Sequence, residues 1–146
     1  MFRGRYEHAI DDKGRLSIPV KFREILKRRK EKELVLTDFD TCLVAYPLKE
    51  WQQFEEKIRT QSSFRKELRD FLRLFYSGAT ESALDSQGRI LIPPQLRERA
   101  GLTRDVVIVG VLNKIEIWSK ERWERFVAQS GGTFEQIAAK LAEAGI

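Results

Sequence analysis

Apolar and polar positions alternate along the chain in short runs, and this pattern predicts an α+β protein built from short strands and short helices. Strands are expected at His8–Ile10, Arg15–Ile18, Leu34–Leu36, Thr41–Tyr46, Ser82–Leu84, Arg89–Ile92, Val106–Leu112 and Ile115–Trp118. Apolar residues three and four positions apart predict helices after Pro19, from Trp51, over Phe64–Tyr76, after Pro93, from Trp123 and from Phe134.

The order of these elements repeats once. Residues 10–24 and 84–98 are identical at seven of fifteen positions, where average residue usage gives roughly one match by chance. The match continues with Trp51 against Trp123 once a two-residue deletion is allowed. The chain is therefore a duplication, and both copies are expected to have the same local structure.

Each copy begins with a strand–turn–strand segment on the pattern Asp-x-x-Gly-Arg. Gly14 and Gly88 stand where a tight hairpin turn often needs a positive φ. Asp11 and Asp85 can accept the backbone N–H bonds that close such a turn. We assign these four residues, together with Arg89, to the structure of the turns.

A single copy of about 45 residues is too small to bury a stable core. Two copies are expected to complete one shared barrel about a pseudo-twofold axis, flanked by helices. The expected organisation is a first module at 5–50, a helical connector at 51–77, a second module at 79–122 and C-terminal helices at 123–146.

Two helix ends carry further signals. Thr133 and Gln136 have the spacing of a capping box, and the helix that follows is expected to pack on its own core or on a neighbouring subunit. The basic run Lys27–Lys30 resembles a DNA-binding patch, but it falls at a predicted helix C-terminus, where cations complement the helix dipole. We interpret it as a helix end.

Charge is uneven along the chain. The net charge is +5, and residues 1–30 hold ten Lys and Arg against four Asp and Glu. An N-terminal excess of this kind suggests an acidic partner, of which nucleic acid is the commonest. Cys42 is the only cysteine, so an intracellular location is expected. No apolar stretch has the length of a membrane span or signal peptide, so neither is expected.

Catalytic and metal-binding patterns are missing from the sequence. His8 and Cys42 are the only soft ligands and do not have zinc-site spacing. A nucleophilic triad would have to use His8, which lies in a predicted strand, and no glycine-rich phosphate loop occurs. The expectation is a protein that is not an enzyme and has no cofactor, no metal and no small-molecule substrate.

Two segments carry a resemblance to a known family. They are Phe2-Arg3-Gly4 with His8 and Asp11-Asp12-Lys13-Gly14-Arg15 through Pro19, and Asp85-Ser86-Gln87-Gly88-Arg89 through Pro93-Pro94. With this spacing, the chain resembles the MraZ family of bacterial transcription regulators, whose two modules belong to the SpoVT/AbrB class. The resemblance covers nearly the whole chain.

This resemblance implies AbrB-like swapped-hairpin modules and closed rings of several subunits. It implies a cytoplasmic, nucleoid-associated regulator that binds double-stranded DNA at short tandem repeats near the promoter of a division and cell-wall gene cluster. It also implies that the pairs Asp11/Arg15 and Asp85/Arg89 belong to the DNA-facing part of the fold.

Arg15 is the first candidate for DNA contact, because a forked side chain beside a turn can reach a phosphate or a guanine edge. The alternative is a salt bridge to Asp11 that only shapes the turn. Further candidates are phosphate contacts, whose alternative is a solvated basic face: Arg3, Arg5, Lys13 and Lys21.

The second copy is less basic than the first. Lys13 and Lys21 correspond to Gln87 and Gln95. We therefore expect the first copy to supply most of the DNA contact, and the second to serve folding and subunit packing. The repeated pairs Arg23-Glu24 and Arg97-Glu98 are interpreted as structural or interface ion pairs.

Two other functions remain open. The same barrel could bind a protein partner as an antitoxin or scaffold module, with DNA contact secondary. An RNA-binding role is also conceivable, but the aromatic residues fall at helical spacing and do not interleave with basic ones along a strand.

Overall fold

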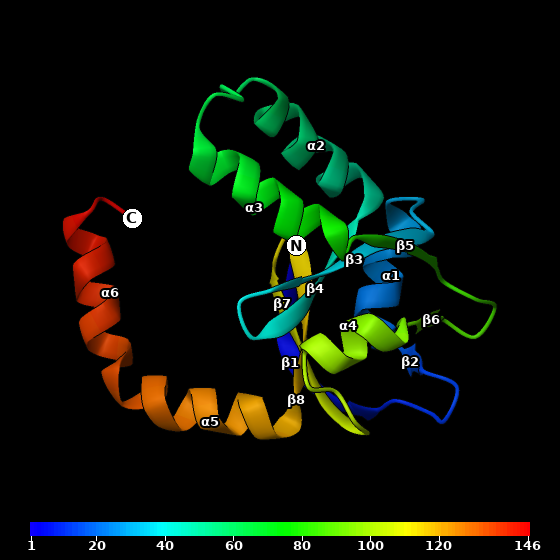
Figure 1. Cartoon of the computed structure of the whole chain (residues 1–146). Coiled ribbons are helices and arrows are strands. Elements are labelled where there is room, and N and C mark those ends of the chain that lie inside the picture. Colours follow the sequence, from blue (N-terminus) through cyan, green and yellow to red (C-terminus); the bar gives the residue numbers. More distant parts are fainter.

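The computed structural model describes residues 1–146 as one six-stranded antiparallel sheet, a two-stranded ribbon and surrounding helices (Figure 1). The strands are β1 Phe2–Ala9, β2 Arg15–Ser17, β3 Glu33–Phe39, β4 Cys42–Pro47, β5 Thr80–Ala83, β6 Arg89–Leu91, β7 Asp105–Leu112 and β8 Lys114–Ser119. The helices are α1 Val20–Arg28, α2 Leu48–Arg59, α3 Lys66–Ser77, α4 Pro94–Arg99, α5 Lys120–Ser130 and α6 Phe134–Glu143, with the 3₁₀ turn η1 Gly131–Thr133 before α6.

The two copies exchange strands. The sheet order is β1-β7-β8-β4-β3-β5, so the first strand of each copy pairs with the long strand of the other copy. The ribbon repeats the exchange, because β2 of the first copy pairs with β6 of the second. Each copy therefore depends on the other for the partners of its first two strands, while β3–β4 and β7–β8 pair within a copy.

The expectation of a closed barrel is not met. β1 and β5 lie at the two edges of the six-stranded sheet, and no pairing joins them. The physical reason is the length of β2 and β6. They have three residues each and pair with one another in a separate two-stranded sheet, so they do not bridge β1 to β5.

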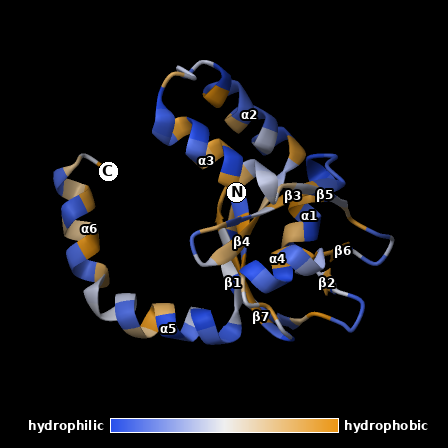
Figure 2. Cartoon of the chain, viewed as in Figure 1, coloured by the Kyte–Doolittle hydropathy of each residue, from blue (hydrophilic) through white to orange (hydrophobic).

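Successive side chains of the central strands point to opposite faces of the sheet, and apolar residues on both faces form two cores. In β3, Leu34 and Leu36 join the larger core with Leu16 and Ile90 of the ribbon. Val35 faces the other way, into a smaller core with side chains of α2 and α3. Figure 2 shows hydrophobic residues gathered in these central strands. Each buried leucine or isoleucine contributes roughly 1.5–3 kcal/mol, so the larger core dominates stability.

A reciprocal contact fastens each turn to the opposite copy. The Gly88 carbonyl accepts a hydrogen bond from Ile18 N, and the Gly14 carbonyl accepts one from Ile92 N, both at 2.9 Å. The Arg23 side chain lies over Gly88, and Arg97 lies over Gly14. The expected ion pairs with Glu24 and Glu98 do not form within the chain, because these arginines cover the turn glycines instead.

The Asp-x-x-Gly turns have the same geometry in both copies. Asp11 Oδ1 accepts from Lys13 N at 3.0 Å and from Arg15 N at 2.8 Å, and Asp85 makes the corresponding bonds to Gln87 N and Arg89 N. Gly14 and Gly88 have φ of +84° and +74°. The backbone N–H and guanidinium donors of each turn's arginine, which favour the carboxylate, lower the pKa of Asp11 and of Asp85.

The C-terminal arm, α5 to α6, differs from the expectation. Thr133 does not cap α6 with its side chain but donates its hydroxyl to the Ser130 carbonyl at 3.0 Å. The capping box fails because Gly131–Thr133 continue as a 3₁₀ turn, which leaves Thr133 at φ −110° and ψ 9° instead of an extended conformation. Figure 1 shows the arm leading away from the sheet, so α6 does not pack on the chain's own core.

Substitution of the turn glycines should destabilise the fold. Gly14→Ala puts a side chain at a left-handed φ, and its Cβ would lie 3.0 Å from Arg97 Cζ, so we expect a loss of about 1–2 kcal/mol. Gly88→Ala should cost more, because its Cβ would overlap Arg23 Cδ. Gly132→Ala is the control, since nothing lies within 4 Å of its Cβ. Chemical denaturation measures the stability of all three variants. Equal stabilities of Gly132→Ala and Gly88→Ala would contradict the close packing of the arginine on the turn glycine.

The turn aspartates predict acid sensitivity. Their pKa lies below the ordinary value of 3.8 in the folded chain, so each carboxylate stabilises the fold above that value. The stabilisation is lost as the pH falls through the folded-state pKa. A ¹³C NMR titration of the carboxyl carbons should give midpoints below 3.8 for Asp11 and Asp85. In Arg15→Gln, the Asp11 midpoint should move up while that of Asp85 stays; midpoints unchanged by that variant would count against the pairing.

Candidate nucleic-acid interface

The β2–β6 ribbon presents one apolar face to the core and one polar face to solvent. Leu16 and Ile90 point inward and are fully buried. The neighbouring residues point outward, with Arg15 opposite Leu91 and Ser17 opposite Arg89. This outer face therefore brings together one arginine from each copy at diagonal positions on adjacent strands.

Both arginines of the ribbon are held at one atom only. Arg15 Nε lies 2.7 Å from Asp11 Oδ2, and Arg89 Nε lies 2.8 Å from Asp85 Oδ2. The alternative considered for Arg15, a turn-shaping salt bridge, is thus present in the structure. Because the Nη atoms make no hydrogen bond within the chain, each guanidinium still has donors that can face a ligand. A fixed Nε with free Nη atoms is a preorganised fork.

The other four candidates for DNA contact lie at three places. Lys13 is exposed in the first turn, next to the ribbon. Arg3 and Lys21 line a cavity of about 780 Å³ between β1 and α1, together with Arg28. Arg3 is six residues from the end of β1, roughly 20 Å along the strand, so the cavity and the turn are separate basic sites. The fifth candidate, Arg5, is exposed on the outer side of β1.

The residue pattern assigned Arg89 to the turn, the family resemblance also implied a DNA-facing place for it, and neither indicated Leu91 as a site residue. Both lie on the outer face of the ribbon, and the Leu91 side chain is 54% exposed. The alternation of a three-residue strand could have indicated this, because residues 89 and 91 must point away from buried Ile90. The face therefore also includes an apolar side chain from the second copy.

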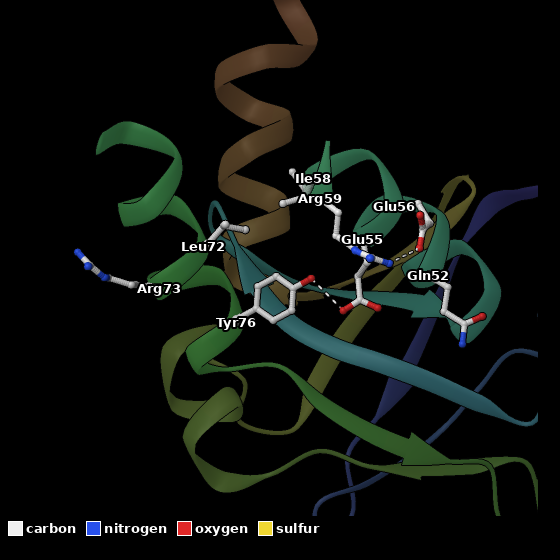
Figure 3. A pocket seen from close by; sticks show the side chains of 8 residues that line it. All are labelled: Gln52, Glu55, Glu56, Ile58, Arg59, Leu72, Arg73 and Tyr76. Carbon is white, nitrogen blue, oxygen red and sulfur yellow. Dashed lines mark hydrogen bonds and ion pairs between the residues drawn. The ribbon is translucent and has the colours of Figure 1, made fainter. Parts of the chain in front are cut away.

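Another cavity lies away from the ribbon, between α2 and α3 (Figure 3). It has a volume of about 900 Å³, and Tyr76 donates its hydroxyl hydrogen to Glu55 Oε2 at 3.0 Å. Partial burial and the Glu55 carboxylate raise the pKa of Tyr76 to about 12, so this phenol remains a hydrogen-bond donor at neutral pH. Arg59 is paired with Glu56 at 3.0 Å. The polar side chains of this cavity are thus paired with one another, Tyr76 with Glu55 and Arg59 with Glu56.

The soft ligands have structural environments. Burial raises the pKa of the Cys42 thiol to about 12, so it stays protonated. His8 Nδ1 lies 2.7 Å from the Ser17 carbonyl oxygen, which links β1 to the ribbon. The structure contains no group of three or more His, Cys, Asp or Glu side chains placed to hold a metal ion. None of its helices has the length and apolarity needed to cross a bilayer.

Comparisons with known proteins match the duplication. The family model described as "MraZ protein, putative antitoxin-like" matches twice, at residues 1–74 and 75–144. These two matches divide the chain into the halves that exchange strands in the structure.

Curated relatives match over nearly the full length. A protein of Moorella thermoacetica named transcriptional regulator MraZ is 46% identical over 143 residues, covering 98% of both chains. Proteins with the same name from Desulforamulus reducens and Caldicellulosiruptor saccharolyticus are 46% and 47% identical, and they cover 98% and 100% of this chain and 99% and 100% of their own. Two matches to the family model and relatives of this identity place the chain in one family: it belongs to the MraZ family.

Proposed function

We propose that the chain is a DNA-binding transcription regulator that reads the duplex with the outer face of the β2–β6 ribbon. The observation that carries the proposal is the placement of Arg15 and Arg89 at diagonal positions on the outer face of one two-stranded ribbon. The major groove of B-DNA admits such a ribbon, and an arginine fork matches the two acceptors of a guanine edge. Leu91 on the same face suits a thymine methyl group. The names of the relatives support the same class of function.

The separate basic groups fit a second role, in which they contact phosphates and position the ribbon. Lys13 lies beside the ribbon, whereas Arg3, Arg5 and Lys21 lie along β1 and α1. Contacts of this kind carry no sequence information but dominate affinity and its dependence on salt. Because Gln87 replaces Lys13 in the second turn, we propose that the first copy supplies more of the contact made by the turns.

We further propose that several subunits form a ring and that this ring binds short tandem repeats in DNA. The resemblance to the family points to a promoter of a division and cell-wall gene cluster as the site. Several ribbons in one assembly would bind repeated sites with high avidity, because each later contact is intramolecular. Footprinting on genomic fragments, combined with mass determination in solution, tests this form. Repeated short protected boxes with a multimeric mass are expected, and a monomer protecting one box would contradict it.

The central prediction concerns the two arginines. Arg15→Gln and Arg89→Gln should each weaken binding to the specific site by about 1–3 kcal/mol and relax the base preference, because each loses a bidentate contact. Because the first copy is proposed to supply more of the DNA contact, Arg15→Gln should lose more affinity than Arg89→Gln. Fluorescence anisotropy with specific and scrambled duplexes measures both effects. Equal losses would contradict the unequal shares, and no loss in either variant would refute the ribbon as the reading face.

A reciprocal exchange of turn residues tests the phosphate role. Lys13→Gln gives the first turn the residue of the second, and Gln87→Lys does the reverse. The slope of log affinity against log salt should fall by about 0.9 in Lys13→Gln and rise by about the same amount in Gln87→Lys. Both side chains are exposed and bond to Asp11 or Asp85 only through the backbone, so stability should not change. A slope insensitive to both substitutions would mean that the turns do not approach the backbone.

A further inference from the structure

A second basic cavity lies at the C-terminal end of α1, against the turn of the opposite copy. It has a volume of about 650 Å³, and Leu84, Asp85, Ser86 and Gly88 form one wall. The other wall carries four cations: Arg23, Lys27, Lys30 and Lys32. The sequence run Lys27–Lys30 is thus divided by the structure, because Arg28 and Arg29 line the other cavity with Arg3 and Lys21.

The two carboxylates that line this cavity, Glu31 and Asp85, are already engaged. Glu31 lies 3.1 Å from Arg29 Nε and accepts from Lys49 N at 2.9 Å. Asp85 is held by Arg89 and by the amides of its own turn. None of the four cations of the cavity forms an ion pair within the chain, and the buried Nε of Arg23 has no hydrogen-bond partner. The cavity therefore holds positive charge that the chain does not neutralise.

The helix end does not require these cations. The last carbonyls of α1 accept from the backbone, with Arg29 N bonding to Ile25 O, Lys30 N to Lys27 O and Glu31 N to Leu26 O. These bonds close the helix in the manner of a Schellman motif without side chains. The expectation that Lys27 and Lys30 serve as dipole partners of the helix does not account for their clustering with Lys32 across the cavity from the second turn.

Lys30 occupies a position that suits glycine. It has φ of +57°, a left-handed conformation that is unfavourable for a residue with a Cβ. At the end of α4 in the second copy the same backbone pattern recurs, with Gly101 N bonding to Glu98 O, and there the left-handed residue is Gly101 at φ +65°. Counted from the helix C-terminus, Glu98 and Gly101 thus occupy the positions of Lys27 and Lys30, because α4 has six residues where α1 has nine. Strain of this kind persists where another demand selects the side chain.

We propose that this cavity binds a phosphate group. In the complex with DNA, which rests on the proposed function, the occupant is a backbone phosphodiester next to the second turn. The end of α1 then supplies the positive charge that the second turn lacks, since Gln87 stands there in place of a lysine. The two ends of the ribbon are both basic, but the second is made basic by the helix of the other copy.

The sharpest variant is Lys30→Gly, which removes strain and charge together. The melting temperature should rise, and the affinity for DNA should fall, with a salt slope lower by about 0.9 if one phosphate contact is lost. The double variant Lys27→Gln/Lys30→Gly should weaken binding roughly tenfold at low salt. Misfolding cannot explain weaker binding in a chain that melts at a higher temperature.

Two control variants separate the effect of relieved backbone strain from the effect of a lost positive charge. Leu112→Gly replaces another exposed left-handed residue, at φ +62°, and should raise the melting temperature without changing binding. Lys57→Gln removes one exposed charge from α2 and should leave the salt slope unchanged. If Lys57→Gln lowers the slope as much as Lys30→Gly does, net charge explains the effect and the cavity is refuted as a site.

A titration with inorganic phosphate and pyrophosphate, followed by backbone amide NMR, distinguishes the sources of the phosphate group. Chemical shift changes that are confined to the amides of residues 27–32 and 85–88 and are absent in the double variant support the cavity as a phosphate site. This conclusion holds even if the wild-type chain binds no duplex, because failure to bind DNA would reject only the proposed function. Weaker DNA binding in Lys30→Gly with no response to free anions supports the phosphodiester alone. Unchanged DNA binding together with no response to either anion overturns the proposal.

Discussion

The exchange of strands between the two copies is the constraint on which the rest of the structure depends. A three-residue strand such as β2 or β6 cannot hold itself against the sheet, and each finds its partner in the other copy. The turn before each strand is then fixed from outside, by an amide of the opposite copy on its glycine carbonyl and by an arginine laid over that glycine. This close approach is possible because Gly14 and Gly88 have no Cβ.

The exchange also determines what the surface can present. Because β2 and β6 are neighbours, any ligand that lies along the ribbon meets side chains from both halves of the chain at once. The aspartate of each turn holds its arginine by Nε, so the geometry that closes the turn also orients the fork. Under the proposed function, folding and recognition share the same carboxylate. The Asp11–Arg15 salt bridge is compatible with DNA contact, because it leaves the Nη atoms of the guanidinium free.

Local signals in the sequence predict the parts of the fold that depend on local physics. The turn glycines at positive φ and the strand–turn–strand order follow from residue types and spacing. The open sheet and the C-terminal arm depend on which strands are too short to bridge the edges and on where a helix continues through Gly131 and Gly132. Lys30 at φ +57° runs against residue preference, so no propensity argument could have located it.

A duplicated chain need not keep its function symmetric, because the fold demands only some positions of each copy. The glycines, aspartates and arginines of the turns recur because both halves need the same closure, whereas exposed cations are free to differ. Charge density near one end of the ribbon is set by whatever lies within about a Debye length, roughly 8–10 Å, and not by which copy supplies it. A comparison of the copies residue by residue therefore makes the second turn look poor in charge, while the strand exchange brings Lys27, Lys30 and Lys32 of the first copy against it.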